Sequence, residues 1–204
     1  SGRLTYGDMT RKLEEQFAAL HDRKYCLFTN SGTSALKIAL GVLKEENGWK
    51  DGDEVIVPAV TFVATVNVIL QNNLKPVLVD VDPDYFDIDV KAIVDKVTKK
   101  TRAIIPVHLL GQPCQIDNVM AVAKTFNLRV IEDSCETMFV KYKGKPVGSW
   151  GDMGCFSSYL AHIISTGVGG FITTNDPAGE QVMRSMIWHG RDPSYLSIDA
   201  NKFT

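Results

Sequence analysis

Short apolar runs alternate along the chain with longer segments in which apolar residues recur at helical spacing. The short runs are rich in Val, Ile and Phe and are bounded by Gly, Pro, Asn or Asp, which is typical of buried strands. They predict strands at residues 25–29, 54–57, 76–81, 103–107, 129–132, 154–158 and 170–173. The helical spacing predicts helices at residues 9–20, 33–46, 63–72, 90–97, 116–126 and 178–188.

This alternation of strands and helices predicts an α/β fold with a mostly parallel central sheet and helices on both faces. In sheets of this kind, binding sites gather at the carboxyl ends of the strands. The residues that directly follow each predicted strand are therefore the first candidates for chemistry.

Composition narrows the class of protein without identifying it. The chain has 204 residues, 45% of them hydrophobic and 23% charged, which suits one domain with a sizeable core. The formal net charge of -2 shows no excess of basic residues, which argues against nucleic acid as a partner. No apolar run reaches the length of a membrane span. The four cysteines, Cys26, Cys114, Cys135 and Cys155, are widely spaced. All but Cys114 lie in or beside apolar strand-like segments, which favours reduced core thiols over disulfides or a metal site. A cytoplasmic enzyme fits these properties.

The first candidate site lies in residues 30–35, where a predicted strand ends and a helix begins. Free backbone N–H groups at a helix start, with small hydroxyl side chains and Gly32 for close approach, can cradle an anion. The alternative is a capped helix without a ligand, in which Ser31 or Thr33 serves as the N-cap.

The second candidate is the pair of carboxylates, Glu132 and Asp133, at the end of the predicted strand 129–132, with Glu136 shortly after it. A carboxylate there could keep a ring nitrogen protonated, bind a metal, or cap a helix. A metal is the weakest of these interpretations, because no histidine-rich segment is nearby.

The third candidate is His162, which lies between the hydroxyl-rich segment 157–159 and the glycine-rich segment 165–170. An imidazole suits proton transfer near neutral pH, although a lone histidine is equally compatible with a structural role. Phe62 follows the predicted strand 54–57 and lies either at the edge of the site or in the core. The pattern around His21 indicates a surface residue.

These segments, in this order and spacing, resemble the DegT/DnrJ/EryC1/StrS sugar aminotransferase family of fold-type-I pyridoxal-phosphate enzymes. The motifs that carry the resemblance are NSGTSAL, GDEVIVPAVTFVAT, KPVLVDVDP, AIIPVHLLGQP, VIEDSCE, YKGKPVGSWGDMGCFS and TGVGG. The resemblance implies an aspartate-aminotransferase-like large domain over residues 25–204, preceded by an N-terminal arm and helix over residues 1–24. The polar end of the chain, residues 191–204, suggests that this domain is truncated and that a C-terminal small domain is missing, and Ser1-Gly2 resembles a tag remnant.

The resemblance also implies roles for the candidate residues. Gly32, Thr33 and Ser157 would bind the cofactor phosphate. Phe62 would stack on the pyridine ring. Asp133 would pair with the ring nitrogen, so that the ring can act as an electron sink.

Two positions depart from the aminotransferase pattern. His162 stands where those enzymes have the lysine that binds the cofactor covalently, and Glu136 stands where they usually have Gln or His. Both departures are similar to the deoxysugar 3-dehydratases, such as GDP-4-keto-6-deoxymannose 3-dehydratase. An engineered replacement of the lysine would also explain His162.

The implied function is a glutamate-dependent 3-dehydratase acting on a nucleotide-linked 4-keto-6-deoxy sugar. Pyridoxal 5'-phosphate and its pyridoxamine form would be held non-covalently, L-glutamate would be the amino donor, and His162 would be the base. A homodimer is expected, with neither nucleic acid nor membrane as partner. One alternative is a sugar 4-aminotransferase in deoxyamino sugar or cell-surface polysaccharide biosynthesis. Another is an inactive cofactor-binding or regulatory homologue.

Overall fold

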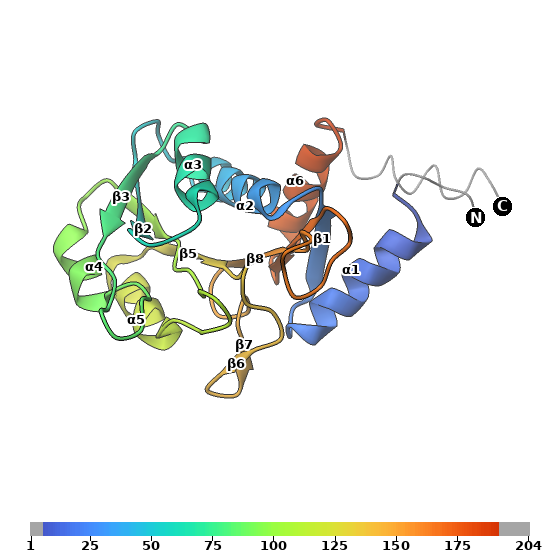
Figure 1. Ribbon diagram of the computed structural model, residues 1–204. Coiled ribbons are helices and arrows are strands. Elements are labelled where there is room, and N and C mark those ends of the chain that lie inside the picture. Colours follow the sequence, from blue (N-terminus) through green and yellow to red (C-terminus); the bar gives the residue numbers. More distant parts are fainter. Residues whose placement is uncertain (1–5, 192–204) are drawn as a thin grey trace.

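A seven-stranded sheet runs through the centre of the molecule, with helices on both faces (Figure 1). The computed structural model describes residues 6–191. Along the sheet the strand order is β1-β9-β8-β5-β4-β2-β3. The strands are β1 (Tyr25–Thr29), β2 (Glu54–Pro58), β3 (Lys75–Val79), β4 (Thr101–Ile104), β5 (Arg129–Asp133), β8 (Met153–Ser157) and β9 (Gly170–Thr174). The helices are α1 (Asp8–Leu20), α2 (Gly32–Glu46), α3 (Val63–Gln71), α4 (Val90–Lys96), α5 (Ile116–Phe126) and α6 (Pro177–Ile187).

The sheet is mostly parallel, which confirms the predicted fold class. β2, β3, β4, β5 and β8 pair in parallel, whereas β9 is antiparallel to both β8 and β1. β1 therefore runs in the same direction as β8, and its carboxyl end lies at the same edge of the sheet. A parallel pair needs a long crossover connection. The segment between β8 and β9 contains no helix, so the chain returns antiparallel.

Alternate residues of each strand enter two different apolar layers. In β2, Val55 and Val57 pack with α2 and α3, while Ile56 packs with α4 and α5 on the other face. This period of two explains why the strands appear as continuous apolar runs, because both faces of the sheet are covered. α2, α3 and α6 cover one face, and α1, α4 and α5 cover the other (Figure 1).

α1 is anchored to the sheet by an aromatic cluster and a buried carboxylate. Phe17 stacks on Phe171 with ring centroids 3.9 Å apart. The Glu14 carboxylate accepts the backbone N–H of Phe28 at 2.8 Å and pairs with Arg184 of α6 at 3.3 Å. These contacts hold the entry helix against β1 and α6.

The prediction that His21 is a surface residue is wrong. His21 has 0% exposure, and its Nδ1 lies 3.0 Å from the Phe17 carbonyl. Its ring contacts Phe17 and Phe156, with centroids 4.4 Å apart in both cases. The polar neighbours of His21 in sequence indicated solvent, but two of the three aromatic rings that enclose it, Phe139 and Phe156, come from distant segments.

A two-stranded hairpin, β6 (Lys141–Tyr142) with β7 (Lys145–Pro146), is an element that the sequence pattern did not predict. Its turn has left-handed backbone at Lys143 (φ 48°) and Gly144 (φ 82°), so the glycine was the available signal. The expectations about Ser1-Gly2 and about the polar end of the chain fall on residues 1–5 and 192–204, outside the described residues. In residues 6–191, no helix is long and apolar enough to cross a membrane.

Candidate active site at the carboxyl edge of the sheet

A pocket of about 450 Å³ opens where the parallel strands end. Its walls come from residues that follow β1, β2, β4, β5 and β8. All of the residues predicted as site residues line it: Gly32, Thr33, Phe62, Asp133, Glu136, Ser157 and His162. The structure thus brings these residues together from segments that are far apart in the sequence, at the edge that the strand pattern indicated.

The start of α2 has the N-cap that was one of the two alternatives from the sequence, and Ser31 rather than Thr33 provides it. Ser31 is the N-cap, and its hydroxyl accepts the N–H of Ser34 at 3.1 Å, while its carbonyl accepts the N–H of Ala35 at 3.0 Å. The first helical amides have no partner within a helix, so those of Gly32 and Thr33 stay available at the pocket. The helix dipole adds positive potential there, so the capped helix can also bind an anion.

Close packing behind this helix start depends on Gly32. A Cβ at this position would lie 2.8 Å from both the Cys135 sulfur and the Ser157 Cβ. The Ser157 hydroxyl oxygen accepts the N–H of Tyr159 at 3.3 Å, which leaves its proton free to donate into the pocket. Gly32 therefore allows α2 to approach the end of β8 and places two kinds of donor side by side.

Asp133 is 4% exposed at the end of β5. Its Oδ1 accepts the N–H of Cys135 at 3.1 Å, and its Oδ2 accepts the hydroxyl of Thr65 at 2.8 Å. One donor on each oxygen fixes the orientation of the carboxylate at the pocket wall.

The neighbouring Glu132 points away from the pocket, because successive residues of a strand face opposite sides. It has 0% exposure and accepts the Nε2–H of His108 at 3.0 Å. It also accepts the backbone N–H groups of Gly148, Trp150 and Gly151 at 2.7, 2.6 and 2.8 Å. Burial opposes the ionisation of Glu132, but these hydrogen bonds together lower its pKa. Of the two adjacent carboxylates, only Asp133 belongs to the pocket.

Phe62 is 66% exposed and lines the pocket, so the core interpretation of this residue is wrong. It is the N-cap of α3, and the extended backbone there (φ -65°, ψ 140°) directs the chain from β2 across the strand ends. A large exposed aromatic ring beside a mostly apolar pocket offers a surface on which a planar ligand can stack.

Glu136 is half-buried, lines the pocket and is hydrogen-bonded to the segment after β4. Its Oε2 accepts the N–H of Leu110 at 3.2 Å. Leu110 and Gly111 both have left-handed backbone, with φ of 49° and 87°. The hydroxyl of Thr137 accepts the Gly111 N–H at 3.0 Å. The Glu136 carboxylate therefore helps to hold a strained turn at the edge of the site.

His162 is half-buried and lines the pocket from the segment between β8 and β9. Its N–H donates to the Tyr159 carbonyl at 2.9 Å, and the two rings meet edge to face with centroids 6.4 Å apart. The base of this segment is closed by the hydroxyls of Ser158 and Thr166, 2.7 Å apart.

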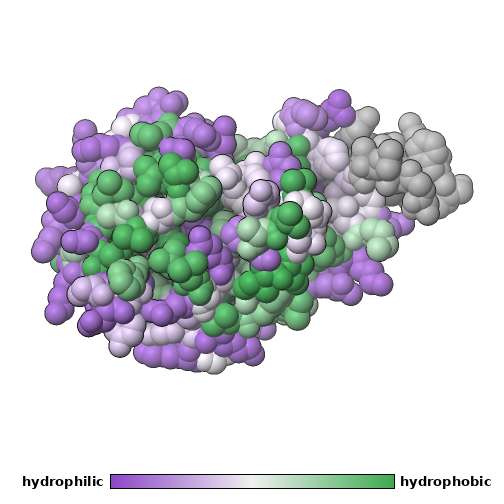
Figure 2. Space-filling model, in the orientation of Figure 1, coloured by the Kyte–Doolittle hydropathy of each residue, from purple (hydrophilic) through white to green (hydrophobic). Residues whose placement is uncertain are grey.

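The segment that carries His162 presents an apolar surface to solvent. Hydrophobic side chains gather over the loop between β8 and β9 (Figure 2). Its exposed apolar residues are Tyr159, Leu160, Ile163, Ile164 and Val168, at 55, 73, 56, 43 and 64% exposure. Such a patch beside a pocket is typical of a surface that contacts another protein segment.

The sequence interpretation missed several residues of the pocket wall: Thr61, Cys135, Tyr159 and Ala161. It also missed Thr65, which lies behind the wall and bonds to Asp133. A signal for Thr65 was present in the sequence: Thr61 and Thr65 are four residues apart at the start of a predicted helix, a spacing that brings two side chains together.

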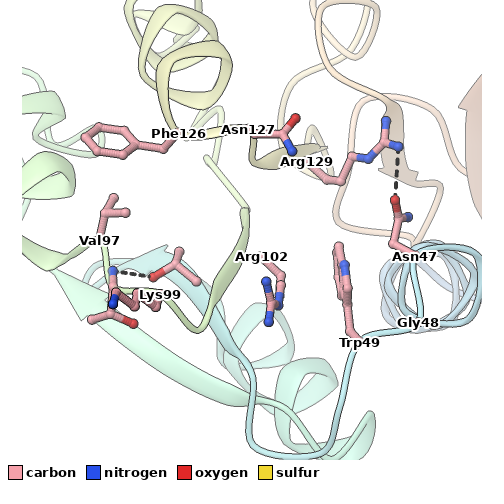
Figure 3. A pocket seen from close by; sticks show the side chains of 11 residues that line it. Asn47, Gly48, Trp49, Val97, Lys99, Arg102, Phe126, Asn127 and Arg129 are labelled. Carbon is pink, nitrogen blue, oxygen red and sulfur yellow. Dashed lines mark hydrogen bonds between the residues drawn. The ribbon is translucent and has the colours of Figure 1, made fainter.

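A second hollow, of about 770 Å³, lies at the opposite edge of the sheet (Figure 3). It is lined by residues at or near the amino ends of β2, β4 and β5, including Trp49, Arg102 and Arg129. Both guanidinium groups are already paired, Arg102 with Asp53 at 2.8 Å and Arg129 with Asp152 at 2.9 Å. Both cations are held in ion pairs, so the pocket at the carboxyl edge stays the candidate active site.

Comparison with known proteins shows similarity along most of the chain. Residues 1–199 match the DegT/DnrJ/EryC1/StrS aminotransferase family. GDP-perosamine synthase of Caulobacter vibrioides is 42% identical over 183 residues, which cover 90% of this chain and 48% of that protein. The chain spans about half the length of the curated relatives that it matches.

Solved structures confirm the aspartate-aminotransferase-like fold. An aminotransferase from Psychrobacter cryohalolentis superposes with a TM-score of 0.88 and 38% identity, covering 93% of this chain and 47% of that one. A GDP-4-keto-6-deoxymannose-3-dehydratase with a trapped PLP-glutamate geminal diamine superposes with a TM-score of 0.87 and 33% identity, covering 91% and 49%.

Proposed function

The chain belongs to the DegT/DnrJ/EryC1/StrS aminotransferase family, and we propose that it supplies most of the cofactor site of a pyridoxal-phosphate enzyme acting on a nucleotide-linked 4-keto-6-deoxy sugar. The observation that carries this proposal is the pocket in which an anion-binding helix start, Phe62 and Asp133 face one hollow together with His162. Each of these groups suits a different part of the same cofactor.

The residues present fit pyridoxal phosphate. The free amides of Gly32 and Thr33, with the hydroxyl of Ser157, would hold the phosphate. Phe62 would lie against the ring, and Asp133, fixed by its two donors, would keep the ring nitrogen protonated. When bound, the cofactor supplies an electron sink for bond cleavage at the substrate.

His162 is the reason to propose dehydration rather than transamination. An imidazole cannot form the covalent bond that the family's lysine makes to the cofactor, so binding would rest on the non-covalent contacts above. His162 would serve instead as the base at the C4′ carbon of the pyridoxamine form, and the cofactor would supply the electron sink for loss of the C3 hydroxyl of the sugar. Glu136 lies in the same pocket and departs from the aminotransferase pattern in the same direction.

The overall reaction balances with L-glutamate as the co-substrate. The keto sugar loses the oxygen at C3 and gains two electrons, while glutamate loses two electrons to become 2-oxoglutarate and ammonia. The relative that carries a PLP-glutamate adduct supports glutamate as the donor.

A sugar 4-aminotransferase is the second candidate. It is supported by the 42% identity to GDP-perosamine synthase, which exceeds the 33% identity to the dehydratase structure. The two reactions differ in where the nitrogen of glutamate goes: a dehydratase releases it as ammonia beside a deoxygenated keto sugar, whereas an aminotransferase retains it in an amino sugar.

We also propose that a second copy of the chain covers the apolar segment between β8 and β9. Its exposed side chains flank the pocket, so a homodimer would shield the site from water. Sedimentation of the intact protein should give a dimer, and Leu160→Glu should shift it toward monomer; a monomeric wild type would refute this part.

The function is tested with the intact protein that contains this chain. We expect L-glutamate to abolish the visible band of bound pyridoxal phosphate, and added GDP-4-keto-6-deoxymannose to yield a sugar lighter by one oxygen atom with equal amounts of 2-oxoglutarate and ammonia. An amino sugar without ammonia would establish the aminotransferase instead. Failure to bind the cofactor would favour an inactive homologue.

A further inference from the structure

Two threonine hydroxyls, of the buried Thr65 and the half-buried Thr61, connect to the Asp133 carboxylate. Thr65, on the first turn of α3, has 0% exposure, and its Oγ1 is 2.8 Å from Asp133 Oδ2. The Oγ1 of Thr61 is in turn 2.8 Å from that of Thr65. The side chains of Thr61, Thr65 and Asp133 therefore form a continuous chain of hydrogen bonds.

The direction of these hydrogen bonds follows from the number of protons. The Thr65 hydroxyl has one proton and two acceptors within reach, Asp133 Oδ2 at 2.8 Å and the Phe62 carbonyl at 3.1 Å. The bond to a carboxylate is shorter and charge-assisted, so it takes the proton. Thr61 must then donate to Thr65, because the remaining lone pairs of Thr65 can only accept.

The same helical turn carries both Thr65 and Phe62. The backbone N–H of Thr65 donates to the Phe62 carbonyl at 3.1 Å. The position of the exposed ring and the position of the hydroxyl behind Asp133 are therefore set by one rigid unit. A shift of either would move the other.

We propose that Thr65, supported by Thr61, is a positioning residue that fixes the Asp133 carboxylate for the ring nitrogen of the cofactor. This inference rests on the proposed function. Without the Thr65 hydroxyl, Oδ2 loses its donor, and the carboxylate keeps only its hydrogen bonds to Cys135. The carboxylate can then turn away from the ring, which weakens cofactor binding and lowers the pKa of the ring nitrogen.

The test compares Thr65→Val, which keeps the shape and removes the hydroxyl, with Thr65→Ser, which restores it. The matched control is Thr173→Val, because Thr173 is equally buried but donates to the Gly148 carbonyl at 3.1 Å, away from the pocket. The intact protein is titrated with pyridoxamine phosphate, and the absorption of the bound cofactor is followed against pH.

We expect Thr65→Val to weaken binding about tenfold, the usual effect of losing one hydrogen bond to a charged group. The pH at which the bound ring loses its proton should fall. Thr65→Ser should restore both properties, and Thr173→Val should change neither. Identical values for Thr65→Val and Thr173→Val would overturn the proposal.

A double-mutant cycle separates positioning from a general effect on folding. On an Asp133→Asn background, Thr65→Val should cause less than about a twofold further loss of affinity, because the carboxylate on which it acts is gone. An equal tenfold loss on both backgrounds would mean that Thr65 does not act through Asp133. Wild-type protein that binds no pyridoxamine phosphate would refute the proposed function, and this inference with it, whereas normal binding by Thr65→Val refutes the inference alone.

Discussion

The His108 Nε2 atom lies 3.0 Å from the Glu132 carboxylate, and both side chains have 0% exposure. The backbone N–H of Cys114 donates to His108 Nδ1 at 3.1 Å, so the ring proton is on Nε2, which donates to Glu132. Glu132 also accepts hydrogen bonds from the backbone N–H groups of Gly148, Trp150 and Gly151. The pair thus ties the loop after β4 and the turn before β8 to β5, directly beside Asp133.

Glu132→Gln should destabilise the protein by about 3 kcal/mol or more, because one amide end of glutamine would face donors that now meet a carboxylate. Urea unfolding of both proteins measures the difference. Asp8→Asn, in an exposed pair with Arg11, is the control and should leave the midpoint unchanged. Equal midpoints for Glu132→Gln and wild type would contradict this account of the network.

Acid should destabilise the protein in two steps. Burial lowers the pKa of His21 below its ordinary 6.5, and its Nε2 has no partner among the described residues. The unfolded chain therefore takes up the proton first, so the stability due to neutral His21 is present above about pH 6.5 and is lost as pH falls through the folded-state pKa. The lowered pKa of Glu132 adds a second loss that begins below its ordinary 4.5.

His21→Leu isolates the first of these steps. It should reduce the fall in the free energy of unfolding between about pH 7 and about pH 5, since leucine has no proton to gain. His189→Leu is the matched control, because His189 is exposed at the end of α6. An unchanged pH slope in His21→Leu would show that other groups cause the acid sensitivity.

Gly32→Ala should damage both stability and cofactor binding. The added Cβ would meet Cys135 and Ser157 at 2.8 Å, and separating α2 from β8 should cost about 1–3 kcal/mol. Gly179→Ala is the comparison, because its nearest neighbour is the end of the Asp176 side chain at 3.1 Å. Thermal unfolding and a titration with pyridoxal phosphate give the two readouts, and equal behaviour of the two variants would exclude the close-packing explanation.

His162→Lys should allow covalent attachment of pyridoxal phosphate and abolish ammonia release, because the replacement restores the family's lysine. Reduction with borohydride followed by mass spectrometry of the peptide detects the attachment. His162→Gln is the control, since it offers neither an amine nor a base. A His162→Lys protein that binds the cofactor without attachment would argue against the proposed place of this residue in the site.

The type and approximate position of most elements were available from the sequence because hydrophobic periodicity is a local property, although β4 lies at Thr101–Ile104 rather than at the predicted residues 103–107. The predicted helix 116–126 matches α5 (Ile116–Phe126), and the predicted strand 25–29 matches β1 (Tyr25–Thr29). The edge at which Ser31, Asp133 and Ser157 would meet also followed from the sequence, since parallel strands carry their carboxyl ends to one side.

Only the tertiary structure decided which neighbours those residues have. In the structure β9 runs antiparallel to β8, and His21 contacts the ring of Phe156 from a distant segment. Glu132 points away from the pocket that Asp133 lines. The tertiary structure also placed the Thr65 hydroxyl against a carboxylate that is distant in sequence. Strand direction and side-chain partners depend on contacts between remote segments, which a local pattern does not encode, whereas the period of the apolar residues depends only on which face of each element is buried.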